Sequence, residues 1–183
     1  MSTALLLMDF QAGIAGRAPE TVIDRATRAL GAAREHGVPV VFVRVAFRDG
    51  LPEVSSRNKA FGSIKDSERA SQMVETAPAT QIVDALAPLA GEPVVVKRRV
   101  GAFVSDLDVV LRGLMVTDLV LAGISTSGVV LSTVRDAADR DFGLTVLADA
   151  CFDPDEEVHR MLTERVFPRQ ATVTTVADWT ASL

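Results

Sequence analysis

Two charged residues and one turn in this sequence could carry out chemistry together. Asp9 follows the apolar run Ala4–Met8, and Lys97 follows the run Pro93–Val96. A group of small residues starting at Gly123 follows a third apolar run. Short runs of this kind predict buried strands. Because the carboxyl ends of parallel strands meet at the edge of a sheet where ligands bind, we expect all three features at one pocket.

The aspartate and the lysine have opposite charges, and each can satisfy the other. A partly buried carboxylate needs a partner, and an ammonium would serve. We therefore expect the side chains of Asp9 and Lys97 to lie within direct or one-water hydrogen-bond reach. Each residue also has a simpler interpretation. Asp9 could cap a loop, and Lys97 could extend its ammonium to water at the strand end.

The turn after the third apolar run is rich in small and hydroxyl residues: Gly123, Ser125, Thr126, Ser127 and Gly128. Apolar residues at helical spacing follow them. A strand, a tight turn and a helix in this order leave backbone N–H groups unpaired at the helix N-terminus. Such groups favour an anion or a developing oxyanion. The alternative is an ordinary connection capped by Thr126 or Ser127.

No other motif in the sequence competes with these features. The chain has no G-x-G-x-x-G, P-loop or G-x-S-x-G pattern. His36 and His159 do not stand in a metal-ligand spacing, so we expect neither a metal nor a cofactor. The one cysteine, Cys151, ends a predicted strand, and we expect it to be a buried, inert thiol.

The composition indicates a protein with a sizeable core and no polyanionic partner. The chain has 183 residues, 48% of them hydrophobic, and a formal net charge of −5. This charge gives no indication of binding to nucleic acid or to an anionic membrane. The first residues lack the features of a signal peptide, and no apolar run reaches the ~18–20 residues of a membrane span. A single cysteine fits a reducing compartment, so we expect a cytoplasmic protein that acts on a small molecule.

Strands and helices alternate along the chain. This pattern predicts one α/β domain over residues 1–183, with a mainly parallel sheet and helices on both faces. The expected strands are Ala4–Met8, Val38–Val45, Pro93–Val96, Val116–Ala122, Leu144–Leu147 and Ala171–Thr174. The expected helices begin near Pro19, Thr80, Ser105, Ser127 and Asp153, with a last helical turn at Trp179. The helix that begins at Thr80 is expected to reach Leu89.

The segment Ala46–Pro78 has no steady hydrophobic period. A loop of this length in a compact domain is usually functional. It carries three large apolar residues, Phe47, Phe61 and Met73, which would otherwise be exposed. We expect this segment to cover the pocket or to form a subunit contact.

Four segments of the chain resemble motifs of the isochorismatase-like cysteine hydrolases, in the same order. LLLMDFQAGI is similar to the first-strand motif, with Asp9 as its aspartate and Gln11 two places on. VVKRRVGAF resembles the lysine motif, with Lys97 as its lysine and Phe103 at its end. LAGISTSGVVLSTVRDAADRDF resembles the motif G-x-x-T-x-x-C-V followed by T-x-R-D-A. LADACFDPDEEVH is similar to a downstream D-A-C-x-D segment.

The resemblance implies a Rossmann-like sheet of six strands in the order 3-2-1-4-5-6, and a homodimer or homotetramer. The cysteine hydrolases of that family use an Asp–Lys–Cys triad, in which the thiolate attacks and the aspartate relays the proton. By resemblance, the peptide bond Ile124–Ser125 would be cis. The oxyanion donors would be the backbone N–H groups of Ser125 and of residue 129.

This sequence departs from the family pattern at the nucleophile. The position that corresponds to the cysteine is Val129, which has no nucleophilic atom, and Cys151 matches a different motif. Residues 46–78 contain no histidine, so the metal ligands of nicotinamidases are absent. We still expect Val129 in the first turn of the helix, with its side chain toward Asp9 and Lys97. True isochorismatases also lack the cysteine, but they carry glycine at that position.

Three hypotheses follow from the sequence. The first is a hydrolase without a covalent step, in which Asp9 is the general acid or base and Lys97 its electrostatic partner. The second is a non-catalytic binder of small molecules that kept the pocket. In the third, Ser127 or Thr126 replaces the thiol, although both are better explained as helix caps. The expected substrate-binding residues are Gln11, Phe103, Ile124, Ser125, Thr126 and Ser127.

Overall fold

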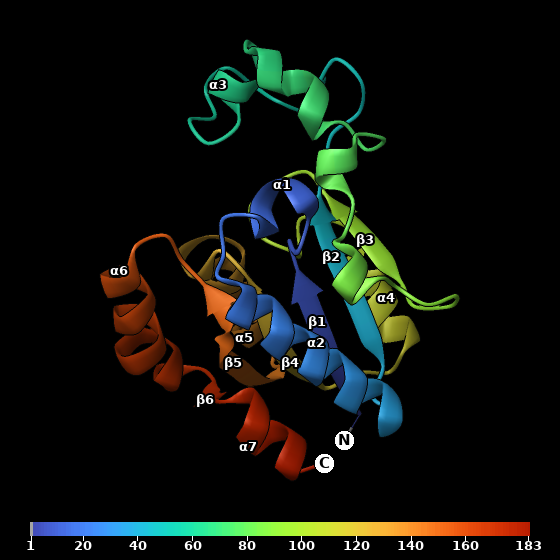
Figure 1. Ribbon diagram of the computed structural model, residues 1–183, viewed down its shortest axis with the longest axis vertical. Coiled ribbons are helices and arrows are strands. Elements are labelled where there is room, and N and C mark those ends of the chain that lie inside the picture. Colours follow the sequence, from blue (N-terminus) through green and yellow to red (C-terminus); the bar gives the residue numbers. More distant parts are fainter. Residues whose placement is uncertain (1) are drawn as a thin grey trace.

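A six-stranded, entirely parallel sheet forms the centre of the protein. The computed structural model describes residues 2–183, and the strands lie in the order β3-β2-β1-β4-β5-β6 (Figure 1). This order confirms the predicted fold class. The strands are β1 (Thr3–Met8), β2 (Val40–Val45), β3 (Val94–Lys97), β4 (Asp118–Ile124), β5 (Gly143–Phe152) and β6 (Thr172–Thr174).

The residues of β1 alternate between two apolar cores, one on each face of the sheet. Ala4, Leu6 and Met8 pack in one core, and Leu5 and Leu7 pack in the other. This alternation follows from the two-residue period of a strand, and a parallel sheet needs both faces covered.

Helices cover the two faces. On one face lie α2 (Glu20–Glu35) and α7 (Val176–Ala181), which pack on Leu5 and Leu7. On the opposite face lie α4 (Leu107–Gly113) and α5 (Leu131–Ala138), and α6 (Glu156–Met161) flanks the sheet beyond β5 (Figure 1). No helix within residues 2–183 is long and apolar enough to cross a membrane.

The predicted helix over Thr80–Leu89 is wrong. This stretch contains only two short 3₁₀ turns, η2 (Pro78–Thr80) and η3 (Asp84–Leu86). Tertiary hydrogen bonds hold its backbone open, because the Val83 N–H donates to the Phe10 carbonyl and Ile82 forms an antiparallel bridge with Gln11. These contacts override the local helical pattern. The strand expected over Leu144–Leu147 is also longer than predicted and continues as β5 to Phe152.

The segment 46–78 lies above the carboxyl edge of the sheet (Figure 1). It contains the short helix α3 (Gly62–Lys65) and the 3₁₀ helix η1 (Glu68–Met73). A third apolar cluster, separate from the two cores of the sheet, joins Phe47, Leu51 and Val54 of the segment to Val45, the last residue of β2. The Phe47 and Phe61 rings meet edge to face, with centroids 5.1 Å apart.

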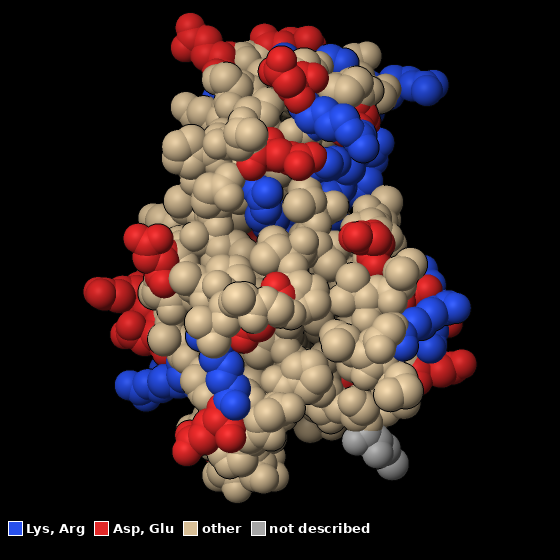
Figure 2. Space-filling model, turned by 90° about the vertical axis from the view of Figure 1, so that its right-hand side faces the viewer, with Lys and Arg blue, Asp and Glu red and all other residues tan. Residues whose placement is uncertain are grey.

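Ion pairs connect this segment to the end of β3. Arg98 contacts both Glu53 and Glu75, and Arg48 also contacts Glu53 at 2.6 Å. Figure 2 shows basic side chains gathered near the upper end of one face, with acidic side chains beside them. The pairs fix the segment relative to the strand that carries Lys97.

Gln11 joins three separate parts of the chain through its buried amide. It begins α1 (Ala12–Ala15), and its Nε2 donates to the Val45 carbonyl at 2.8 Å and to the Thr80 carbonyl at 2.9 Å. Its Oε1 accepts from the Val45 N–H at 2.7 Å. The side chain therefore continues the hydrogen bonding of β2 beyond the strand and holds the ends of β1 and β2 together.

Replacement of Gln11 by leucine should destabilise the protein. Leucine fills a similar volume but leaves the buried Val45 N–H and its carbonyl without partners, at a cost of about 1–3 kcal/mol for each group. Urea unfolding of Gln11→Leu should give a lower free energy of unfolding than the wild type. Gln72→Leu, at an exposed position, is the matched control. Equal stability of the Gln11 variant and the control would contradict this role.

Candidate active site

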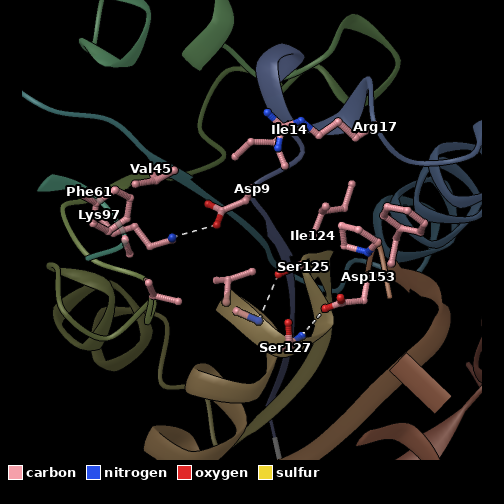
Figure 3. A pocket seen from close by; sticks show the side chains of 16 residues that line it. Asp9, Ile14, Arg17, Val45, Phe61, Lys97, Ile124, Ser125, Ser127 and Asp153 are labelled. Carbon is pink, nitrogen blue, oxygen red and sulfur yellow. Dashed lines mark hydrogen bonds and ion pairs between the residues drawn. The ribbon is translucent and has the colours of Figure 1, made fainter. Parts of the chain in front are cut away.

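Four polar residues meet where four strands end. Asp9 follows β1, Lys97 is the last residue of β3, Ser125 follows β4 and Asp153 follows β5. The sheet register brings these ends level, because Met8 pairs with Gly123 and Val45 pairs with Lys97. All four residues line one cavity of about 540 Å³ (Figure 3). The cavity lies beside the junction of β1 and β4, where the strand order reverses, as expected for an open parallel sheet.

Asp9 and Lys97 form a buried ion pair. The Lys97 Nζ lies 2.8 Å from the Asp9 Oδ2. The Lys97 side chain is 1% exposed, and the Asp9 side chain is 7% exposed. Lys97 also donates to the Arg99 carbonyl at 3.1 Å. This geometry confirms the predicted contact between the two residues.

The second carboxylate oxygen of Asp9 is free to act on a ligand. Asp9 Oδ1 is buried and has no hydrogen-bond partner among residues 2–183. Asp9 also adopts a left-handed backbone conformation with φ of 60°, which aspartate tolerates better than most residues. A buried acceptor without a partner is costly, so such atoms concentrate where function requires them.

Burial and charge act on Asp9 in opposite directions. Burial raises the pKa of the Asp9 carboxyl above its ordinary value, and the nearby Lys97 ammonium opposes that rise. Desolvation is the larger effect. A raised pKa makes the Asp9 carboxylate a stronger base than an ordinary aspartate, and it brings proton uptake and release closer to neutral pH, as general acid–base chemistry requires.

The turn after β4 has the geometry that the resemblance implied. The Ile124–Ser125 peptide bond is cis, and a π-helical turn, η4 (Thr126–Val130), leads into α5. The cap of this turn is Ser125, and not Thr126 or Ser127 as the alternative proposed. The Ser125 side chain accepts a hydrogen bond from the Gly128 N–H at 3.1 Å.

Close contact with β1 requires a glycine just before this turn. A Cβ atom on Gly123 would lie 2.8 Å from the Met8 carbonyl oxygen, which is closer than real Cβ contacts. Because Met8 precedes Asp9, the missing side chain brings the turn next to the aspartate. Gly123 therefore sets the distance between the Asp9 carboxylate and the turn after β4.

Val129 occupies the position predicted for the missing nucleophile. It lies within the first turn after β4 and lines the same cavity as Asp9 and Lys97, with 2% of its surface exposed. This placement confirms the predicted position of the residue. The match of this position to the nucleophile of the cysteine hydrolases stays a prediction from the resemblance.

Cys151 does not supply a nucleophile to the cavity, because it is not among the residues that line it. It lies within β5, paired with Gly123 of β4, and it is buried. Burial raises the pKa of the Cys151 thiol to about 12, so the thiolate is not populated near neutral pH. The predicted inert thiol agrees with this environment.

Three residues that the sequence grouped with the site do not line the cavity. Gln11 makes the backbone contacts described above, and Phe103 packs against Phe142 with the Arg140 guanidinium 4.8 Å from its ring centre. Thr126 is fully buried, and its Oγ1 lies 2.8 Å from the His159 Nδ1. The three residues match the motifs by residue type, but their side chains contact other parts of the protein and not the cavity.

The sequence interpretation missed two charged residues of the cavity. Asp153 is 7% exposed, and its Oδ2 accepts the Ser127 N–H at 2.8 Å. Arg17 follows α1 and lines the opening. Asp153 could have been found, because it follows a strand just as Asp9 does. The sequence around Arg17 has no strand end or motif that would have marked it.

Phe61 lines the cavity from the segment 46–78, which confirms that this segment covers the pocket.

Comparison with known proteins gives one consistent family. The isochorismatase domain model matches residues 3–178. The chain is 32% identical over 185 residues to YecD of Escherichia coli O157:H7, an uncharacterized isochorismatase family protein, covering 97% of this chain and 94% of that protein. It is 32% identical over 170 residues to the ureidoacrylate amidohydrolase RutB of Stutzerimonas stutzeri, covering 81% of this chain and 68% of that protein.

A solved structure has the same fold. An isochorismatase family protein from Burkholderia thailandensis superimposes with a TM-score of 0.82 at 27% identity, covering 100% of this chain and 95% of that chain. The N-carbamoylsarcosine amidase of Thermoplasma acidophilum has a TM-score of 0.77 at 24% identity, over 96% of this chain and 97% of that chain, a likeness of fold alone.

Removal of the Lys97 ammonium should destabilise the protein in a pH-dependent way. Lys97→Met leaves a buried, unpaired carboxylate at neutral pH, which costs about 3–5 kcal/mol. Without the ammonium, the pKa of Asp9 rises further above its unfolded value. The folded state then binds a proton that the unfolded state releases, so stability falls as pH rises through the folded pKa. Denaturant unfolding across pH should show a smaller deficit in acid.

The double variant Asp9→Asn/Lys97→Met tests the cause of this deficit. It contains no buried charge at the pair, so most of the lost stability should return and the pH dependence should disappear. A Lys97→Met protein as stable as the wild type at neutral pH would show that the pair is not desolvated.

A thiol introduced at Val129 should be reactive. In Val129→Cys the sulfur would face the N-terminal end of a helical turn and the Lys97 ammonium, and both favour the thiolate. Alkylation by iodoacetamide should therefore proceed at a lower pH than it does for free cysteine. The wild-type protein, with only the buried Cys151, should react slowly. An ordinary thiol pH profile would show that residue 129 does not face the positive end of the site.

Proposed function

This chain belongs to the isochorismatase family, and we propose that it hydrolyses a small molecule through Asp9 and Lys97 without a covalent cysteine step. The fold is that of the family's hydrolases. One observation supports the proposal above the others. A buried carboxylate is held by an ammonium at 2.8 Å, and its second oxygen, without a partner among residues 2–183, lies at a cavity of substrate size.

In this proposal, Asp9 moves a proton between water and the leaving group. As the water oxygen attacks the substrate carbon, one water proton passes to the free oxygen of Asp9. The same proton then passes to the leaving atom as its bond to carbon breaks, so Asp9 returns to its charged form. Lys97 keeps Asp9 charged between turnovers. The backbone N–H groups of Ser125 and Val129 would stabilise the negative charge that develops on the substrate oxygen.

A hydroxyl nucleophile is the weaker mechanism. Thr126 is buried away from the cavity against His159, and Ser125 Oγ already accepts the Gly128 N–H. Ser127 lines the cavity, but no base contacts its hydroxyl among residues 2–183. A serine without a base in hydrogen-bond reach is not activated.

The alternative function is a non-catalytic binder of small molecules. Val129 supports it, because this residue replaces the nucleophile with an inert side chain while the pocket around it remains. A protein of this kind would bind the same ligands and leave them intact.

Asp9→Asn separates the two functions. We propose a screen of small amides, carbamates and vinyl ethers with the wild type, with Asp9→Asn and with Asp24→Asn, an exposed control. If Asp9 moves the proton, its loss should lower kcat/KM by about 10²–10⁴-fold, and the control should match the wild type. As a base, Asp9 must be charged, so the wild-type rate should fall as pH falls through a pKa above that of an ordinary aspartate.

The outcomes point in different directions. Turnover that survives in Asp9→Asn would contradict the proposed mechanism. A ligand that raises the melting temperature of the wild type without being hydrolysed would favour the binding protein.

A further inference from the structure

Two consecutive residues of the turn after β4 are held by the segment that follows β5. The Ser127 N–H donates to the Asp153 Oδ2 at 2.8 Å (Figure 3). One residue earlier, the Thr126 Oγ1 lies 2.8 Å from the Nδ1 of His159, which belongs to α6. Neither Thr126 nor His159 lines the cavity, and the proposed hydrolysis uses neither side chain. Their contact therefore has no role in the chemistry described so far.

The direction of this hydrogen bond follows from the burial of the threonine. Thr126 is fully buried, and His159 is the only hydrogen-bond partner of its hydroxyl among residues 2–183. A buried hydroxyl proton needs an acceptor, so the hydroxyl donates to the imidazole Nδ1. A ring nitrogen accepts only when it carries no proton. His159 is therefore neutral in this structure, with its proton on Nε2.

Protonation of His159 would end this contact. The imidazolium carries a proton on both nitrogens, so the Thr126 hydroxyl proton would lose its acceptor. The charged ring would also be attracted to Asp153 and Glu156, whose charges act on it. The turn η4 contributes no charged residue, and the Asp155 carboxylate caps α6. Burial is the largest effect and lowers the pKa of His159, so the ring becomes charged only in mild acid.

The hydrogen bonds that define the turn lie directly beside Thr126. The Gly128 N–H donates to the Ser125 Oγ at 3.1 Å, and the Val130 N–H donates to the Ser125 carbonyl at 3.2 Å. Thr126 is the next residue after Ser125 and begins η4. A change in the position of Thr126 would therefore disturb both bonds, together with the N–H groups of Ser125 and Val129.

We propose that His159 is a positioning residue for the turn after β4. In its neutral form it fixes Thr126, and through Thr126 it holds the conformation on which the N–H groups of Ser125 and Val129 depend. Its protonation releases Thr126 and loosens the turn. The use of these N–H groups as oxyanion donors rests on the proposed function, whereas the conformation of the turn can be measured without turnover.

Amide hydrogen exchange, measured by NMR across the titration of His159, tests this role. The reporters are the N–H groups of Gly128 and Val130, because both bond to Ser125 and not to a titratable group. After correction for the intrinsic effect of pH on exchange, their protection should fall roughly tenfold as His159 is protonated. A loss of this size corresponds to one buried hydrogen bond.

Variants at the contact separate the acceptor from the rest of the ring. His159→Asn supplies an amide oxygen that does not titrate, so protection should stay high across the pH range. His159→Leu and Thr126→Val lack the acceptor and the hydroxyl, respectively, and their protection should be low at every pH. The matched control is His36→Asn, because His36 is the only other histidine and is exposed at the end of α2. It should keep the wild-type pH response.

The same variants connect the turn to turnover. Any amide, carbamate or vinyl ether that the wild type hydrolyses should be hydrolysed faster below neutral pH by His159→Asn than by the wild type. The acid limb that belongs to Asp9 should remain in both proteins.

The outcomes separate the role of His159 from the hydrolysis. Protection that stays constant through the titration of His159 in the wild type would overturn the role, and so would a pH response that persists in His159→Asn. The expected pattern of protection without turnover of any compound supports the role and contradicts the proposed hydrolysis. Turnover with constant protection does the reverse.

Discussion

The buried ion pair between Asp9 and Lys97 is the constraint on which the rest of the structure depends. Removing two charges from water costs several kcal/mol per ion, and only a short, well-aligned contact offsets that cost. The two residues come from strands that are not adjacent, since β2 lies between β1 and β3. All three strands must therefore end at the same level. The Gln11 amide, which holds the end of β2, and the Arg98 pairs beyond β3 both act on this alignment.

The opposite side of the site depends on the connection after β5. Asp153 accepts the Ser127 N–H, and His159 lies 2.8 Å from the Thr126 hydroxyl, so two consecutive residues of the turn are held from one segment. Burial lowers the pKa of His159, against the opposing effect of Asp153 and Glu156. A neutral imidazole can accept a hydrogen bond from the threonine hydroxyl at this distance. The segment after β5 thus holds the shape of the turn after β4.

The parts of the fold and site that could be predicted from sequence are those fixed by local pattern. Apolar runs predicted the strands. The rule that ligands bind at the carboxyl ends of parallel strands predicted that Asp9, Lys97 and the turn after β4 lie at one pocket. The strand order came from the resemblance of the motifs. The helix expected over Thr80–Leu89 failed because Gln11 and Phe10, distant in sequence, bind that backbone. Arg17 could not be predicted either, because its position depends on how α1 packs above the sheet.

The separate apolar centre of segment 46–78 has a consequence for the rate at which ligands enter and leave. Phe61 forms part of the cavity wall, yet it packs on Phe47 and not on either core of the sheet. A unit with its own small core opens at a lower free-energy cost than the whole domain. We therefore expect hydrogen exchange to be faster in this segment than in the sheet, and we expect the residence time of a ligand in the cavity to depend on how often the segment opens. Substitutions that strengthen its core would slow ligand exchange while leaving the reactive pair untouched.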